Sequence, residues 1–339
     1  MRRRTLIVGL AATAGTGALT ACTAPTRPVA GGASPSASPA VSAPASASAA
    51  PILASTAASS LAPRDVSAPY TPVPGSAPAA YAVGRQVLRF QRGSDRALPT
   101  TVWYPATGAA SDTPHPVEDA APAAGRFPLV LFSHGLTSRP DDYVAILARW
   151  AGAGFVVAGP TYPRTSYGAA DFDAGDIVNQ PADASSVIDS LLAHGGPLGA
   201  IIDPDRLAAA GHSGGGITTV GLFSAYRDER LKAGVVFNGT DFQGVPFTGP
   251  PAALLFVHGR RDNTVTHRAG HAVFAAVPWS RAMLSITEGG HVTKAPDFTA
   301  TVGTSTEFLR WALYGDAAAK ARIPAAAAAD NVGTLEDQL

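Results

Sequence analysis

Short apolar runs that alternate with amphipathic segments are the feature that most limits the folds open to this chain. Residues 128–132 read Pro-Leu-Val-Leu-Phe, a continuous apolar run of the kind that a buried parallel strand has. The next segment repeats apolar side chains at the spacing of one helical face: Tyr143, Ile146, Leu147, Trp150 and Ala151. Further strands are expected at residues 154–158, 206–210, 234–237, 252–257 and 281–286, and helices at 184–192, from 215, at 266–276 and at 304–314.

Two more strands, at residues 83–90 and 98–104, precede this alternation. The whole pattern predicts an α/β fold: one mostly parallel sheet with helices on both faces. Only residues 238–251 separate the strand that ends at Phe237 from the next strand, so no large cap domain is expected there.

A serine stands where a predicted strand meets a predicted helix, in the sequence Gly211-His212-Ser213-Gly214-Gly215. The pattern G-x-S-x-G in this position is typical of a nucleophile elbow, a turn so tight that the outer glycines must lack a Cβ. Ser213 is therefore the candidate nucleophile. His212 is expected to pack near the site without transferring a proton.

A serine hydroxyl becomes a good nucleophile only beside a base that a third group orients. Asp262 follows the strand at 252–257, and His291 follows the strand at 281–286. The carboxyl ends of parallel strands meet at one edge of a sheet, where open α/β sheets place their sites. We therefore predict a catalytic set of Ser213, Asp262 and His291.

Asp241 is the alternative acid, because it follows the strand that ends at Phe237. Asp262 is favoured because it comes after the following strand, with Val265 behind it. His134 and His258 stand at strand ends beside glycines, and we expect structural hydrogen bonds from both.

No metal site is predicted. His267 and His271 are four residues apart on a predicted helix, but no third ligand is evident, and a solvated face is expected. Asp171, Asp173 and Asp176 alternate in a loop, for which a solvent-facing position is favoured over a calcium site.

Acyl transfer by a serine also needs N–H donors for the oxyanion that forms on the substrate. The backbone N–H of Gly214, directly after the nucleophile, is one candidate. The second is the N–H of Leu136, in the loop that follows the strand at 128–132. Residues 161–180 are the expected wall of an acyl pocket.

The first 22 residues resemble an export signal. Three arginines at positions 2–4 precede an apolar stretch, residues 6–19, that is too short and too rich in glycine to span a membrane. It ends in Leu19-Thr20-Ala21-Cys22, which resembles the lipobox of bacterial lipoproteins. We expect removal of residues 1–21 and a lipid on Cys22, with export by the twin-arginine or the general route. The protein would then be extracytoplasmic and anchored to the bacterial membrane.

The chain divides into four segments by composition. Residues 22–80 are almost entirely Ala, Ser, Pro and Thr, which predicts a disordered tether behind the signal at 1–21. Residues 81–314 form the expected catalytic domain. Residues 315–339 are rich in alanine and are expected to pack poorly.

Charge and cysteine content narrow the partners. The 25 basic and 25 acidic residues cancel, so no electrostatic footprint for nucleic acid is present. Cys22 is the only cysteine, which excludes an intramolecular disulfide. We expect a monomer.

From about residue 81 to 314 the chain resembles the dienelactone-hydrolase-like branch of the α/β-hydrolases. The segments at 131–136 and 154–158 look like the platelet-activating-factor acetylhydrolase pattern. The spacing of Ser213, Asp262 and His291 looks more like that of cutinases and polyester hydrolases. The resemblance implies carboxylic-ester hydrolysis without a cofactor.

Three departures separate the chain from these groups. Asn238 stands where the acetylhydrolases carry their acid, and Leu136 stands where polyester hydrolases usually place an aromatic residue. True dienelactone hydrolases use a cysteine nucleophile, whereas this elbow carries Ser213. The substrate is therefore predicted only as a small-molecule, lipid or polymeric ester.

The expected mechanism is acyl transfer through an acyl-enzyme on Ser213. Two alternatives remain. The same three residues would serve a thioesterase or a peptidase, and a surface lipoprotein could keep the fold only for binding.

The lipobox generates the first prediction. Replacing Cys22 by alanine should move the protein from the membrane fraction to the soluble fraction or block its processing, because the lipid would have no attachment point. Fractionation of cells followed by immunoblotting tests this. A correctly processed variant that stays fully membrane-bound would show that the lipobox interpretation is wrong.

Overall fold

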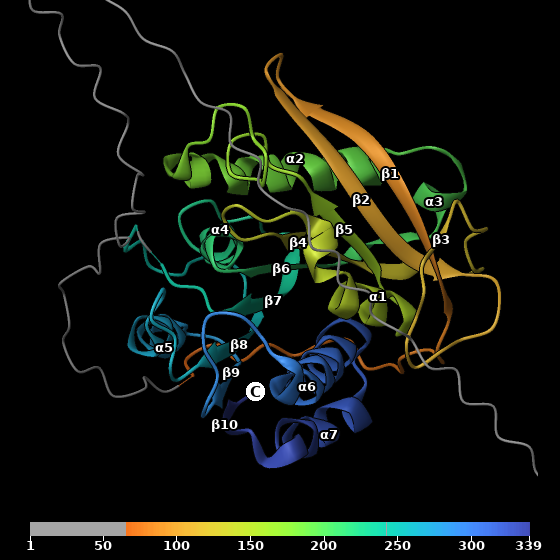
Figure 1. The fold of residues 1–339 in the computed structure, drawn as a ribbon. Helices are drawn as coiled ribbons and strands as arrows, with labels where there is room; N and C mark the ends of the chain where they lie inside the picture. The colour runs from red at the N-terminus through yellow and green to blue at the C-terminus, as the bar shows by residue number, and fades with distance from the viewer. Residues whose placement is uncertain (1–65, 242) are drawn as a thin grey trace, which may run out of the picture. The chain divides into compact units, whose positions relative to one another are not determined.

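Ten strands form one sheet in the part of the chain that the computed structural model describes, residues 66–241 and 243–339 (Figure 1). In chain order they are β1 (Ala82–Arg92), β2 (Arg96–Ala106), β3 (Val117–Glu118), β4 (Phe127–Ser133), β5 (Val156–Pro160), β6 (Ile202–His212), β7 (Leu231–Phe237), β8 (Ala253–Gly259), β9 (Arg281–Ile286) and β10 (Gly333–Gln338). Their spatial order is β10-β9-β8-β7-β6-β4-β5-β2-β1-β3. From β5 to β9 the neighbours pair parallel, while β2 and β10 pair antiparallel with β5 and β9. The predicted fold class is confirmed.

Helices cover both faces of this sheet. They are α1 (Val144–Gly152), α2 (Gln180–Leu192), α3 (Gly196–Ala200), α4 (Gly214–Phe223), α5 (His267–Ala276), α6 (Ala295–Tyr314) and α7 (Ala317–Ala327), with short 3-10 helices η1 (Pro140–Tyr143), η2 (Ala174–Asn179) and η3 (Ala329–Asn331). Buried residues of α1, α6 and α7 share one core cluster, and those of α2, α4 and α5 share the other. Residues 238–252, with the exception of the undescribed position 242, contain no helix or strand, in agreement with the absence of a large cap there.

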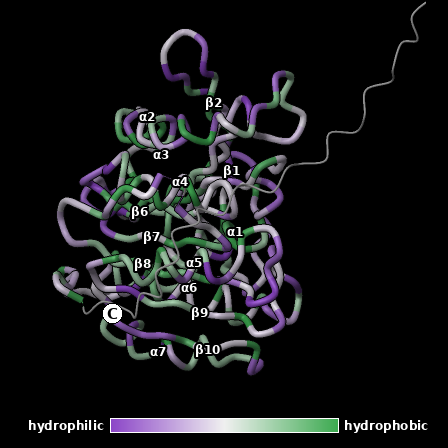
Figure 2. The backbone as a smooth tube through the Cα atoms, turned by 90° about the vertical axis from the view of Figure 1, so that its left-hand side faces the viewer, coloured by the Kyte–Doolittle hydropathy of each residue, from purple (hydrophilic) through white to green (hydrophobic). Residues whose placement is uncertain are grey.

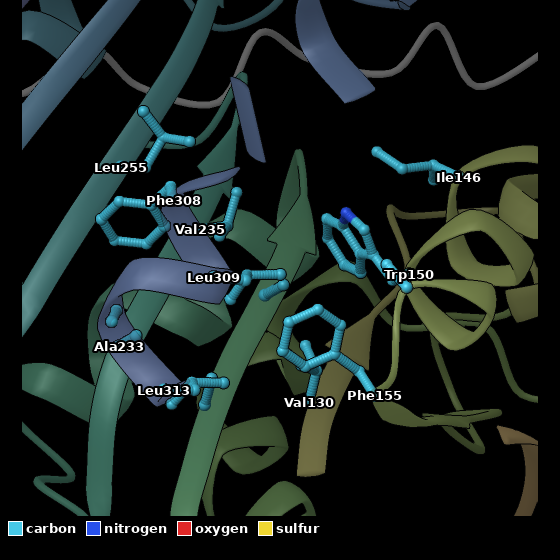
Figure 3. Packing of buried hydrophobic residues seen from close by; sticks show 14 of the residues in the cluster. Val130, Ile146, Trp150, Phe155, Ala233, Val235, Leu255, Phe308, Leu309 and Leu313 are labelled. Carbon is cyan, nitrogen blue, oxygen red and sulfur yellow. The ribbon is translucent and has the colours of Figure 1, made fainter. Parts of the chain in front are cut away.

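Successive side chains of the buried strands point to opposite faces of the sheet, and they therefore contribute to both core clusters. In β4, Val130 and Phe132 face the first cluster, whereas Leu129 and Leu131 face the second. Figure 3 shows the first cluster, with Trp150 of α1 on one side of Val130 and helix α6 on the other. Burial of each large apolar side chain contributes roughly 1.5–3 kcal/mol. Hydrophilic segments lie mainly in the outer loops (Figure 2).

The C-terminal tail does not behave as predicted. Instead of packing poorly, it forms α7, whose Ala319, Ile323 and Ala327 are buried at helical spacing. It then forms β10, which pairs along the whole of β9. The physical reason is the exposed edge that β9 would otherwise present, because an unpaired strand edge leaves a row of backbone groups without partners.

The N-terminal boundary of the domain also differs from the expectation. The proposed tether was placed at 22–80, yet residues 66–80 lie against the domain. The Tyr70 hydroxyl donates to the Ala312 carbonyl at 2.8 Å, and its ring contacts Trp311 edge-on. Tyrosine in a segment otherwise made of small residues supplies the apolar area that this contact needs. The signal, Cys22 and the rest of the tether, residues 1–65, lie outside the described residues.

A buried ion cluster attaches the loop at 161–180 to the β1–β2 hairpin. Arg96 donates to both oxygens of Asp176, at 2.9 and 2.7 Å, and to Asp183 at 2.8 Å. Arg92 donates to Asp183 at 2.6 Å. The side chains of Asp176 and Asp183 are 4% and 0% exposed. The expectation that Asp176 faces solvent with Asp171 and Asp173 is therefore wrong, because Arg96 draws it inward.

None of the helices within residues 66–241 and 243–339 is both long and apolar enough to cross a membrane.

The ion cluster generates a prediction about stability. Arg96→Met keeps the apolar stem of the side chain but leaves two buried carboxylates without their main partner. The free energy of unfolding at pH 7, measured by urea denaturation, should fall by about 3–5 kcal/mol. Arg92→Met is the matched control. Because Arg92 is one-third exposed and contacts only Asp183, its loss should cost about 1 kcal/mol or less.

The wild-type protein and the Arg96→Met variant should respond differently to acid. Burial by itself would raise the pKa of Asp176, but hydrogen bonds from Arg96 and Asn179 outweigh it and leave the pKa below its ordinary value. The ionised carboxylate therefore stabilises the fold above about pH 4, and this contribution is lost as the pH falls through the lowered pKa. The stability difference between wild type and Arg96→Met should shrink below about pH 4. An unchanged difference at pH 3 would indicate lost packing rather than lost ion pairing.

Candidate active site

The predicted elbow lies between β6, which ends at His212, and α4, which begins at Gly214. Ser213 has φ 56° and ψ −118°, a conformation that costs about 1–3 kcal/mol in a residue with a side chain. Its N–H donates to the Phe237 carbonyl of β7 at 2.9 Å. A Cβ on Gly211 would collide with the Gly215 carbonyl, and a Cβ on Gly215 would collide with the Ser133 carbonyl. The two glycines are thus required by this turn, as the motif predicted.

The structure brings the three predicted residues together. His291 Nε2 lies 2.8 Å from Ser213 Oγ, and His291 Nδ1 lies 2.8 Å from Asp262 Oδ2. They follow β6, β8 and β9, so they share the carboxyl edge of the parallel strands. The Asp262 side chain is fully buried, and that of His291 is 19% exposed. One continuous hydrogen-bonded chain therefore runs from a buried carboxylate to a hydroxyl beside solvent.

Several donors converge on Asp262. The N–H groups of Thr264 and Val265 donate to Oδ1 at 2.8 and 2.9 Å, while Asn238 and His291 contact Oδ2. Burial alone would raise the pKa of Asp262, but hydrogen bonds from His258, His291, Asn238 and Val265 outweigh it and hold the pKa far below its ordinary value. Asp262 is therefore ionised at neutral pH.

Asp241, the alternative acid, has a local partner instead. Its Oδ1 accepts the N–H of Gln243 at 3.0 Å within its own loop. Of the two candidate acids, Asp262 is the one bonded to His291.

Asn238 has a role at the site that sequence reasoning did not assign. One N–H of its side chain donates to Asp262 Oδ2 at 2.8 Å, and the other donates to the Gly290 carbonyl at 3.0 Å. Asn238 thus ties the acid to the loop that carries His291. Its φ of 47° is one that asparagine tolerates better than most residues. The sequence carries a signal of this role, because Asn238 stands where the acetylhydrolases carry their acid.

Leu136 and Gly214, the residues whose N–H groups are the predicted oxyanion donors, are close neighbours. A Cβ built on Gly214 would stand 3.2 Å from Leu136 Cγ and 3.0 Å from Ile177 Cδ1. Within residues 66–241 and 243–339, neither the Leu136 N–H nor the Gly214 N–H donates to another protein group. The neighbouring Gly135 N–H, by contrast, donates to the Tyr143 hydroxyl. The two N–H groups that the motif predicts as oxyanion donors are therefore not used by the protein itself.

The remaining histidines are held by structural bonds. His134 Nδ1 lies 2.8 Å from the Gly135 carbonyl, and its Nε2 accepts the Tyr162 N–H. His258 Nε2 lies 2.8 Å from the Val265 carbonyl. The hydrogen bonds predicted for both are present, and His258 Nε2 also lies 3.4 Å from Asp262 Oδ2.

His267 and His271 do not form the expected solvated face. His267 Nε2 lies 2.7 Å from the Ser285 hydroxyl, and His271 Nε2 lies 3.1 Å from Glu336. His267 thus contacts β9 and His271 contacts β10, so neither ring lies on a fully solvated face. Among the residues that the structure describes, no group of three or more metal-ligating side chains occurs.

Comparisons with known proteins agree with this architecture. The family model described as Chlorophyllase matches residues 86–239, from β1 to just beyond β7. No curated protein matches the chain. Among solved structures, a ferulic acid esterase from Streptomyces cinnamoneus aligns with a TM-score of 0.52 and 22% identity. That alignment covers 68% of this chain and 78% of the esterase. Both matches agree with the fold described above, and the chain therefore has the α/β-hydrolase fold.

Proposed function

We propose that the protein is a serine carboxylic-ester hydrolase whose triad is Ser213, His291 and Asp262. The observation that carries the proposal is the unbroken chain of 2.8 Å contacts from Asp262 through His291 to Ser213 Oγ. Asp262 accepts the Nδ1 proton, which leaves Nε2 of His291 as the acceptor that faces the hydroxyl. That tautomer is the one a general base requires.

In the first half of the reaction, Ser213 Oγ attacks the ester carbonyl as His291 Nε2 takes its proton. The imidazolium is stabilised by ionised Asp262, and it then returns the proton to the leaving alcohol. In the second half, His291 takes a proton from water, which attacks the acyl-enzyme and releases the acid. Ser213 then regains its proton.

The negative oxygen of each tetrahedral intermediate would accept hydrogen bonds from the N–H groups of Leu136 and Gly214. Both lack protein acceptors: Leu136 lies in the loop after β4, and Gly214 is the first residue of α4, directly after Ser213. Loss of one such donor typically costs about 3–4 kcal/mol of transition-state stabilisation.

Ile177 supports the proposed place of the acyl pocket. It belongs to η2, within the loop at 161–180, and its Cδ1 lies against Gly214. Arg96 donates two hydrogen bonds to the adjacent residue, Asp176. We assign this loop to the wall that receives the acyl group. A second candidate function, thioester or peptide hydrolysis, would use the same triad. The esterases among the similar proteins favour the ester substrate.

The location outside the cytoplasm is part of the proposal. It rests on the resemblance of residues 19–22 to a lipobox. A lipid on Cys22 would hold the domain near the membrane surface, where small-molecule, lipid and polymeric esters are all accessible.

The nucleophile generates the first functional prediction. Ser213→Ala should abolish ester hydrolysis, leaving at most about 10⁻³ of wild-type turnover, while the melting temperature changes little. Turnover is measured on p-nitrophenyl esters of graded acyl length, with matched thioester and amide substrates beside them. Unchanged turnover of the folded variant would refute the assignment. Hydrolysis of amides or thioesters alone would favour the second candidate.

The acid, Asp262, generates the second functional prediction. Asp262→Asn should favour the wrong imidazole tautomer of His291 and lower kcat by about 10⁴-fold, as in the serine-protease triad. Asp241→Asn is the matched control, and its kcat should stay within about twofold of wild type. Circular dichroism must first show both variants folded, because Asp262 also accepts two backbone N–H groups. A crippling effect of Asp241→Asn with a mild effect of Asp262→Asn would reverse the assignment.

A further inference from the structure

His212, directly before the nucleophile, uses both of its ring nitrogens. Its Nε2 lies 2.6 Å from the backbone carbonyl oxygen of His291, and its Nδ1 lies 2.9 Å from the Tyr143 hydroxyl. That hydroxyl in turn accepts the N–H of Gly135 at 3.1 Å. Gly135 immediately precedes Leu136. A chain of three hydrogen bonds therefore joins the loop after β4 to the loop that carries His291.

The direction of every bond in this chain is determined. A carbonyl oxygen only accepts, so His212 Nε2 carries the proton. In the neutral ring Nδ1 must then accept, and the Tyr143 O–H is its donor. The oxygen of Tyr143 is left to accept the Gly135 N–H. The Tyr143 hydroxyl also has the Ser138 side chain within hydrogen-bonding reach, but the donation from His212 Nε2 to the carbonyl requires an acceptor at Nδ1 as long as His212 is neutral.

Burial and packing hold His212 in that state. Removal from water lowers the pKa of His212 to about 4. Its ring lies 5.6 Å from the Tyr143 ring and 4.9 Å from the His291 ring, centre to centre. It is therefore uncharged at neutral pH, and the two flanking rings restrict its rotation.

The chain joins the two halves of the proposed site on either side of Ser213. One end lies beside the oxyanion donor Leu136, and the other holds the backbone of the general base His291. We propose that His212 and Tyr143 are positioning residues that fix the distance between the oxyanion donors and His291. This inference rests on the proposed function, since it assigns roles within that reaction. It differs from the packing role that the sequence indicated for His212.

The expected consequence is a defect in the chemical step. Oxyanion donors and a general base act only within a few tenths of an ångström of their required places, and a misplacement of about 1 Å can lower the rate by about 10²-fold. His212 and Tyr143 transfer no proton in the mechanism and act only by positioning groups that stabilise the transition state. Their loss should therefore lower kcat and leave KM nearly unchanged.

Three variants test this: Tyr143→Phe, His212→Phe and the double variant. Tyr143→Phe removes only the hydroxyl group, whereas His212→Phe replaces the imidazole by a larger aromatic ring that cannot form these hydrogen bonds. Tyr104→Phe is the control, since the Tyr104 hydroxyl donates to the Ala120 carbonyl at 2.9 Å and takes no part in the site. The measurements are kcat and KM on a p-nitrophenyl ester, the rate of labelling of Ser213 by a fluorophosphonate, and amide hydrogen exchange followed by mass spectrometry.

Each single variant should lower kcat about 10- to 100-fold, with KM within about threefold, while Tyr104→Phe stays near wild type. The double variant should lie within about threefold of the worse single variant, because one break already disconnects the two loops. Tyr143→Phe should also speed exchange in residues 289–293, which Tyr143 does not touch. Should His212→Phe fail to fold, the exchange and kcat of Tyr143→Phe still decide the matter.

Two results would overturn the positioning role. One is a double variant whose loss equals the product of the single losses. The other is Tyr143→Phe with wild-type kcat, or with unchanged exchange in residues 289–293. Failure of the proposed function gives a different result, namely a wild-type protein that neither hydrolyses esters nor takes the label on Ser213.

Discussion

A carboxylate without exposed surface governs the arrangement of the site. Transfer of an ion out of water is so unfavourable that Asp262 stays ionised only because donors surround it. Two of these donors are backbone N–H groups of its own loop, and Asn238 adds a third from the end of β7. His258, at the end of β8 just before that loop, adds a further contact, and His291 completes the set from the loop after β9. Three separate segments thus meet around one charge, and the position of His291 relative to Ser213 follows from it.

The parallel sheet makes this convergence possible at little conformational expense. Strands β6, β7, β8 and β9 are neighbours and point the same way, so four consecutive loops begin at one edge. Each loop then has to supply only one or two side chains. The rigid core beneath, in which alternate residues of each strand pack on opposite helical layers, holds those loop origins in place. Chemistry and stability are therefore largely carried by different residues.

The ion cluster around Arg96 extends the same principle to the rim of the site. It ties Asp176 of η2 and Asp183 of α2 to the β1–β2 hairpin, and it thereby places Ile177 against Gly214. The wall of the proposed acyl pocket depends on a contact with residues far away in the chain. Sequence reasoning could not find that contact, because Arg96 and Asp176 carry no local pattern that relates them.

Local chemistry explains what the sequence alone determined. The periodicity of apolar residues follows directly from backbone geometry, so it located the parallel strands and the helices between them. The elbow glycines are also a local signal, because they are neighbours of Ser213 in the sequence. Ser213, Asp262 and His291 could be selected because each follows a predicted strand. The tail from 315 was mispredicted, because its composition is uninformative and its packing depends on the edge of β9. Residues 66–80 were mispredicted for the same reason, since Tyr70 meets Trp311 only in the folded domain. The roles of Asn238, Tyr143 and His212 likewise appeared only in three dimensions. A hydrogen bond between groups distant in sequence leaves no periodic signal, so only the tertiary structure could decide which side chains hold the candidate site together.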